Sequence, residues 1–307
     1  MTNDTSTAPT ATFHAGEQAL QAQVGARERL AEIGPLVIRD HMPEQHRAFF
    51  AQLPFLIVGS LDAQGQPWAS VLAAPVGFLQ TPDAQHLHVA ARPDAADPLH
   101  GALAEGAALG LLGIEPHSRR RNRMNGRVAS ADKRGFTVAV SQSFGNCPKY
   151  IHVRRAEVVG RVAGPPQRMD VLDAAARAMI ANADTFFVAS AHPHTAPGSA
   201  RAEGVDVSHR GGPAGFVRID GDVLTVPDYA GNRFFNTLGN LMLAPQAGLL
   251  FVDFETGDLL QVAARAELVL DGPELATFEG AERLLKLHVV SALRRPAALP
   301  LAWAGAV

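Results

Sequence analysis

The chain has 307 residues, which is long enough for one large domain or two of ordinary size. Its 47% hydrophobic and 19% charged residues are typical of a protein that buries a core, and 28 glycines with 21 prolines favour a β-rich fold with many turns. A net charge of −3 gives no general attraction to nucleic acid, and the single cysteine, Cys147, excludes an intramolecular disulfide and a zinc site built from cysteines.

The N-terminal segment 1–13 is rich in Thr and Ala and lacks a basic region followed by an apolar one. We interpret it as a flexible leader and not as a signal peptide. No run of 18 apolar residues occurs, so we expect no membrane-spanning segment and a cytoplasmic protein. Apolar spacing then predicts a helix over 16–33 that ends at Gly34-Pro35, and Pro43 is placed to open a second helix through Phe50.

Short apolar runs separated by turn residues predict a series of strands in the first half. We place them at 54–60, 68–73, 86–90, 108–114, 125–128, 136–141 and 151–162. A Gly-Pro-Pro sequence at 164–166 marks a boundary, and a helix over 169–180, a strand at 185–190 and a helix near 232–243 follow it. Strands that alternate with turns favour barrels over a parallel α/β sheet.

An internal repeat with a constant separation of 138 residues is the most informative pattern. Residues 70–78 align with 208–216, residues 110–115 align with 248–253, and Arg127 aligns with Arg265. We infer a duplicated chain, which we divide into a leader and helix at 1–34, a first split-barrel half at 35–163 and a second at 164–307.

The two copies differ in their polar residues. His209 and Arg210 of the second copy align with Val71 and Leu72, and Asn232 and Arg233 align with Asp94 and Ala95. Conversely, the arginine-rich run 119–123 of the first copy aligns with 257–261, which holds no arginine. This complementary loss predicts one site assembled between the two halves.

Local motifs leave alternatives open. The segment 227–240 places Gly231, Asn232 and Arg233 at an expected helix start, which favours an anion site, although a plain capped helix fits as well. The segment 208–212 offers donors at a strand end or merely a polar turn. The run 119–123 suits a phosphate or carboxylate ligand, a solvated loop or, less well without aromatic residues, a nucleic acid.

Metal and nucleophile motifs are weak. His192 with His194, and His86 with His88, lack a carboxylate or third ligand at a usual spacing, so we predict no metal site. No nucleophile elbow, P-loop or dinucleotide-binding glycine motif occurs, and we interpret Cys147 as a buried or loop thiol.

Several blocks together resemble the pyridoxamine 5′-phosphate oxidase-related, FMN-binding split-barrel family, and in particular its long members with two copies. The blocks are 43–60, 110–115, 119–128, 141–151, 208–216 and 231–254. The resemblance implies a mainly β (α+β) fold of two split β-barrels with peripheral helices. It also implies FMN bound between two barrels, usually across a homodimer.

The resemblance further implies His209 and Arg210 near the flavin ring, and Asn232, Arg233 and Asn236 near the phosphate. Arg123 is the repeat counterpart of Gln261, a position from which this family reaches into the other barrel's site. With polar neighbours from the same motifs, the candidate cofactor-binding residues are Ser208, His209, Arg210, Asp228, Asn232, Arg233, Asn236, Arg123, Asn146 and Lys149. No catalytic residue is predicted.

The expected function is that of an FMN-dependent oxidoreductase. It would move electrons or hydride between a nicotinamide or a separate reductase or ferredoxin and a small substrate, because no cluster-binding cysteines are present. The basic residues typical of true pyridoxamine phosphate oxidases are missing, so vitamin B6 is not the expected substrate. The alternative is a non-catalytic split-barrel protein that binds flavin or haem.

Overall fold

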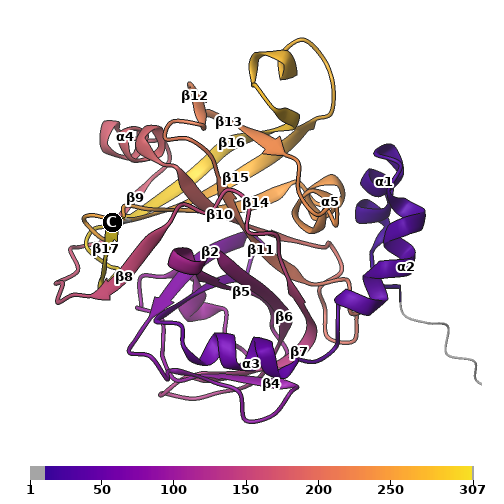
Figure 1. The fold of residues 1–307 in the computed structure, drawn as a ribbon. Helices are drawn as coiled ribbons and strands as arrows, with labels where there is room; N and C mark the ends of the chain where they lie inside the picture. Colours follow the sequence, from indigo (N-terminus) through magenta and orange to yellow (C-terminus); the bar gives the residue numbers. More distant parts are fainter. Residues whose placement is uncertain (1–10, 306–307) are drawn as a thin grey trace, which may run out of the picture.

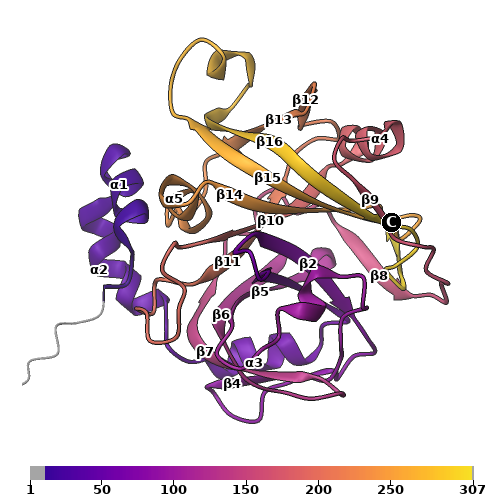
Figure 2. The ribbon, with the colours of Figure 1, turned by 180° about the vertical axis from the view of Figure 1, so that it is seen from behind.

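Two large antiparallel sheets account for most of the chain in the computed structural model, which describes residues 11–305 (Figures 1 and 2). The first sheet has the strand order β2-β1-β5-β6-β7-β4-β3. Its strands are β1 (Phe55–Leu61), β2 (Pro67–Ala73), β3 (Leu79–Gln80), β4 (His86–Val89), β5 (Ala108–Glu115), β6 (Arg120–Ala131) and β7 (Phe136–Gly145).

The second sheet repeats this topology in the order β11-β10-β14-β15-β16-β13-β12. Its strands are β10 (Thr185–Ala191), β11 (Val205–Gly211), β12 (Arg218–Asp220), β13 (Val223–Tyr229), β14 (Gln246–Val252), β15 (Leu259–Val269) and β16 (Ala281–Arg295), and β9 (Gln167–Met169) pairs with β16. A separate ribbon joins β8 (Arg154–Val158) to β17 (Leu301–Gly305).

The pairing register confirms the duplication residue by residue. Ile57 lies opposite Leu112 in the first sheet, and Phe187 lies opposite Leu250 at the same place in the second. Leu112 and Leu250 are 138 residues apart, the separation found in the sequence. The predicted mainly β fold with two copies of one split barrel is therefore confirmed.

The helices are peripheral, as predicted, and lie around the two barrels (Figure 1). In both views α3 lies against the first barrel and α4 against the second, while α1 and α2 lie next to α5, on the side away from β8 and β17 (Figures 1 and 2). Their bounds are α1 (Ala15–Gln23), α2 (Arg27–Val37), α3 (Glu44–Ala51), α4 (Ala174–Asn182) and α5 (Asn236–Leu243), with short 3-10 turns at Pro98–Gly101, Pro116–Ser118 and Leu275–Thr277. No helix within residues 11–305 is long and apolar enough to cross a membrane.

Four apolar clusters are buried in the described residues, and three of them lie within and between the barrels. One fills the first barrel, around Phe50, Leu111 and Phe136, and one fills the second, around Phe186, Leu249 and Phe251. A third lies between the barrels and takes residues from β1, β2, β5, β10, β11 and β14. Because the shared cluster is apolar and buried, it keeps the barrels packed against each other.

Two equivalent glycines let the barrels approach this closely. A Cβ on Gly110 would lie 2.6 Å from the Val205 carbonyl oxygen, and a Cβ on Gly248 would lie 2.2 Å from the Pro67 carbonyl oxygen. Both pairs are again 138 residues apart, so the contact between β5 and β11 matches the contact between β14 and β2. Only glycine leaves room for a neighbouring backbone at such a distance.

The predicted N-terminal helix is wrong in its extent. The helix is interrupted at Gly25, which has a φ of 64°, so two helices form in place of one. The second helix, α2, continues through Gly34 and Pro35 to Val37. Residues 1–10 of the predicted leader lie outside the described residues. Phe13 is 3% exposed and contacts Phe234, so it belongs to the packed structure and not to a flexible leader.

The observed strand boundaries differ from the predicted ones where a strand contains mostly polar residues. The predicted strand 125–128 is the middle of β6, and the predicted strand 136–141 is the first part of β7. The remaining residues of both strands are largely polar. The predicted strand 151–162 shortens to β8, and Met169 lies in β9 and not in the helix that follows. The helix predicted near 232 begins four residues later, at Asn236.

The glycine contact gives a stability prediction. Gly110→Ala and Gly248→Ala should each lower the free energy of unfolding by about 1–3 kcal/mol, because the methyl group meets fixed backbone and forces the barrels apart. Gly101→Ala is the matched control, since a Cβ there has no neighbour within 4 Å. Urea unfolding followed by circular dichroism measures the difference, and equal midpoints for all three variants would contradict the role of the glycines.

Candidate functional site: a cationic cleft between the barrels

A cleft that is open to solvent lies where the two barrels meet. Strand β6 of the first barrel and the segment after β7 form one wall. Strands β11, β13 and β16, the turn at 231–235 and the start of α5 form the other. All ten predicted site residues line this cleft: Ser208, His209, Arg210, Asp228, Asn232, Arg233, Asn236, Arg123, Asn146 and Lys149.

The cleft is strongly cationic. Among the described residues, its lining includes a single carboxylate, Asp228, and six cationic side chains: Arg121, Arg123, Lys149, Arg210, Arg233 and Arg283. Asp228 forms ion pairs with Arg210 and with Arg283, the latter at 2.9 Å, and is 6% exposed. The remaining cations give the cleft a positive potential that favours an anionic ligand.

Arg123 crosses from the first barrel into the second, as the repeat predicted. It lies on β6, and its guanidinium donates to the side chains of Ser208 and Asn236, the latter at 2.9 Å, and pairs with Asp206 at 3.3 Å. The side chain is 8% exposed, and burial lowers its pKa while Asp206 opposes that shift. A buried charge with these partners ties the two walls of the cleft together.

The other half has an uncharged counterpart of this contact. Gln261 lies on β15 at the position equivalent to Arg123, and its amide donates to Ser70 Oγ at 3.1 Å and to the Ala69 carbonyl at 2.9 Å. Ser70 donates to Asp97, which is 3% exposed and pairs with the buried Arg295.

Asp94, which aligns with Asn232, lies 3.9 Å from Arg295. The position that the repeat relates to the cleft therefore holds an ion pair and a further carboxylate, whereas the cleft offers cations without such partners.

His209 is neutral and adds no positive charge to the cleft. It is 8% exposed, and burial together with the neighbouring Arg121 and Arg210 holds its pKa well below the ordinary value of 6.5. Its Nδ1 lies 2.9 Å from an Arg121 Nη1, so Nδ1 accepts this hydrogen bond. Burial lowers the pKa of Arg121 to about 10, which leaves it charged at neutral pH.

The open end of the cleft carries Asn232, Arg233 and Lys149. Arg233 has a φ of 61° and an exposed side chain that makes no hydrogen bond or ion pair within residues 11–305. Asn232 Oδ1 accepts from the Phe234 amide at 3.1 Å, which shapes a turn before α5. The expectation that Asn232 and Arg233 open the helix is wrong, because the left-handed turn delays the helix to Asn236.

Four buried donors in the cleft have no hydrogen-bond partner within the part of the chain that the structure describes. They are the Nε atoms of Arg121, Arg123 and Arg210 and the Nδ2 atom of Asn146. Leaving such groups unpaired costs on the order of 1–3 kcal/mol each. These atoms have almost no accessible surface, so a ligand in the cleft could supply a partner only after the side chain turns toward it.

Sequence reasoning missed several residues of the cleft. Arg121 belongs to the run 119–123 that was considered for an anionic ligand, but it was not singled out, although strand alternation places it on the same face as Arg123. Cys147 is half-buried in the wall. Tyr150 stacks on Tyr229, with ring centroids 5.2 Å apart. Arg283 lines the cleft because the pairing of β13 with β16 places it opposite Asp228. No local sequence pattern reveals this pairing.

Helix α1 supports the cleft from outside. Glu17 is 2% exposed, accepts from the Asn236 side chain and from the His14 amide, and reaches α5 because Gly16 and Gly239 cross in close contact. Burial and the nearby Asp206 raise the pKa of Glu17 well above its ordinary value. Asn236 is thereby held between Glu17 and Arg123.

The neutral His209 predicts a pH dependence of stability. The unfolded ring takes up a proton near pH 6.5 and the buried ring does not, so this contribution is complete above pH 6.5 and is lost as the pH falls. Between pH 7.5 and 5.5 the wild type should lose about 1.4 kcal/mol that His209→Gln does not lose. Urea unfolding at both pH values measures this, and identical losses in the two proteins would show that His209 is protonated when folded.

The sequence matches one known protein family twice. A family model for pyridoxamine 5′-phosphate oxidase matches residues 42–164 and again residues 172–301. A search of curated proteins found no match.

Similar solved structures include HupZ from Group A Streptococcus, with 13% identity over 38% of this chain and 89% of that chain and a TM-score of 0.29. They also include an FMN-binding protein from Syntrophomonas wolfei, with 11% identity over 38% of this chain and 80% of that chain and a TM-score of 0.27. An FAD-binding protein from Mesorhizobium loti has 10% identity over 42% of this chain and 97% of that chain, with a TM-score of 0.28. Since the family model matches most of the sequence in two successive copies, the chain belongs to the pyridoxamine 5′-phosphate oxidase family.

Proposed function

We propose that the chain binds FMN in the cationic cleft and acts as an FMN-dependent oxidoreductase. The observation that carries this proposal is the excess of cations over carboxylates in the lining of a cleft of this family's fold. FMN carries a phosphate dianion and a ring edge rich in acceptors, so its charge and hydrogen-bonding groups fit these residues.

The phosphate is assigned to the open end of the cleft. Arg233 and Lys149 are exposed cations there, and Asn232 contributes an amide. A guanidinium without a protein partner is free to form two parallel hydrogen bonds with phosphate oxygens. The single cluster of this kind favours FMN over FAD, whose second phosphate and adenosine would need a further site.

The polar edge of the flavin ring is assigned to the buried end. Arg121 and Arg210 provide unpaired Nε–H donors there, and Ser208 lies next to Arg123. Flavin supplies the capacity to accept and pass on a hydride or single electrons. The charged Arg121 would stabilise negative charge on a bound ligand, and the neutral His209 holds that guanidinium in place through Nδ1.

The proposed reaction has an electron donor and an electron acceptor of stated chemical classes. The electrons come from a nicotinamide or from a separate reductase or ferredoxin, and the acceptor is a small molecule. No catalytic side chain is assigned.

The phosphate assignment predicts a selective effect of Arg233→Ala. FMN affinity should fall by roughly 10- to 100-fold, because one charge-assisted contact is lost. Riboflavin affinity should hardly change, because riboflavin has no phosphate. Arg134→Ala is the control, since Arg134 is exposed and outside the cleft. Titrations followed by flavin fluorescence measure the affinities, and equal losses for FMN and riboflavin would place Arg233 outside the phosphate site.

The asymmetry of the two halves predicts one FMN per chain. The position equivalent to the cleft in the other half carries Asp94 and the Asp97–Arg295 pair where phosphate donors would be needed, so a dianion would meet repulsion there. After reconstitution with excess FMN and removal of free flavin, denaturation should release one equivalent, measured by absorbance. Two equivalents would contradict the asymmetry, and a Soret band without flavin bands would indicate haem instead.

A further inference from the structure

The loop between β10 and β11 distinguishes the second copy from the first. It runs over residues 192–204, whereas its counterpart between β1 and β2 runs only over residues 62–66. The duplicated half thus provides an internal reference, and it shows that this loop is longer than the shared fold requires. The additional length carries side chains that could bind a ligand.

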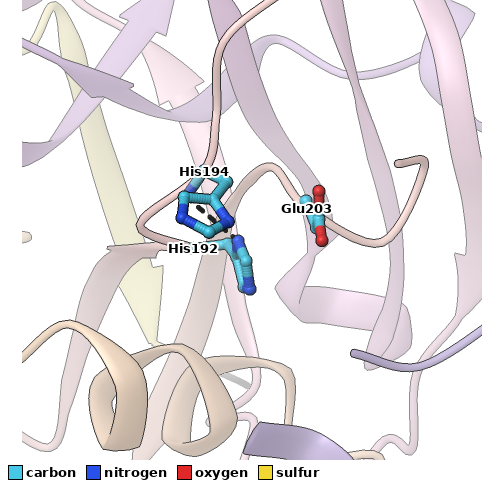
Figure 3. Close-up of side chains that lie close together, drawn as sticks. All are labelled: His192, His194 and Glu203. Atoms are coloured by element: carbon cyan, nitrogen blue, oxygen red, sulfur yellow. Dashed lines mark hydrogen bonds between the residues drawn. The ribbon is translucent and has the colours of Figure 1, made fainter. Parts of the chain in front are cut away.

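Three potential metal ligands meet in this loop (Figure 3). His192, His194 and Glu203 each offer one ligand atom, and these atoms lie within 4.8 Å of one another. The hairpin brings them together, because the His192 amide donates to the Gly204 carbonyl at 3.0 Å and so places Glu203 beside the two histidines. Spacing along the chain had suggested that His192 and His194 lack a carboxylate, and the structure provides one.

His192 anchors the group of ligands. Its exposed fraction is 6%, so its ring is packed in place at the start of the loop. Its Nδ1 accepts from the His194 amide at 3.1 Å, so Nε2 carries the proton of the neutral ring. A metal ion therefore binds this ring by displacing the amide from Nδ1, or at Nε2 after the proton has moved to Nδ1. His194 is exposed and free to move toward an ion.

The surrounding structure holds the loop from two sides. Arg127 of β6 donates to the Thr195 and Ala196 carbonyls at 2.9 and 2.8 Å and to the Ser199 hydroxyl at 2.9 Å. The His14 ring, just before α1, packs edge-on against the His192 ring with centroids 4.9 Å apart. The loop is therefore held close to the conformation that gathers the three ligands, which reduces the entropy cost of binding.

We propose that His192, His194 and Glu203 bind one divalent transition-metal ion of the zinc type, with water as the remaining ligand. Two imidazoles and a carboxylate are donors that zinc accepts, whereas calcium and magnesium prefer oxygen ligands alone. Tetrahedral coordination at about 2.1 Å needs ligand atoms about 3.4 Å apart, so binding draws together any pair of these atoms that now lies farther apart. The ion would fasten the additional loop in place.

Isothermal titration of untagged, chelator-treated, flavin-free protein with ZnCl₂ tests the proposal. The wild type should bind one ion per chain. His194→Ala and Glu203→Gln should each weaken binding by at least about tenfold, since loss of a direct ligand costs no less than loss of a group that orients one. His86→Ala is the matched control, because His86 pairs with Asp83 at 2.9 Å but lies outside the loop.

Thermal unfolding provides a second measurement. Zinc should raise the melting temperature of the wild type and of His86→Ala but not that of His194→Ala, whose exposed side chain is dispensable for folding. Absence of binding by the wild type, or equal affinity of the wild type and the loop variants, would overturn the proposal. Because no flavin is present, either result leaves the proposed FMN function to be judged separately.

Discussion

The buried contact of Arg123 with the second barrel is the interaction on which the site depends. Two similar barrels could pack through apolar contacts in several orientations, because hydrophobic burial has little directional preference. The Arg123 guanidinium, which is 8% exposed, permits far fewer orientations of the barrels. It must bond to Asp206, Ser208 and Asn236, because otherwise a buried charge is left unpaired. The contact thus fixes how β6 faces β11 and α5, and with them the two walls of the cleft.

Duplication explains why this contact occurs once. The same position in the other copy holds Gln261, which makes an equivalent but uncharged contact with Ser70. In that half, Asp97 and Arg295 form an ion pair, whereas Arg121 and Arg233 in the cleft make no ion pair with a carboxylate within residues 11–305. The fold is nearly symmetric and the charges are not. One half-site could change freely after duplication, because a single chain no longer has to build two identical sites.

The sequence was sufficient for the fold and for much of the cleft. Because each copy serves as a reference for the other, the constant separation identified the duplication, and the unmatched polar residues pointed to one site. Local sequence patterns gave wrong helix boundaries where residues with positive φ angles set those boundaries. The left-handed turn at Arg233 and Phe235 moved the helix start, and Gly25 divided the first helix. Arg283, Glu17 and Glu203 reach their partners only through pairing or packing across the chain, so no motif could predict them.

The central claim is that the cleft between the barrels, completed across them by Arg123, holds a flavin. A crystal structure of the protein grown with FMN tests it most directly. The account predicts electron density for one FMN per chain, with its phosphate at the open end beside Arg233 and its ring toward Arg121 and Arg210. Density for FMN at the equivalent position beside Gln261 and Asp97, or an unchanged cleft at saturating FMN, would contradict it.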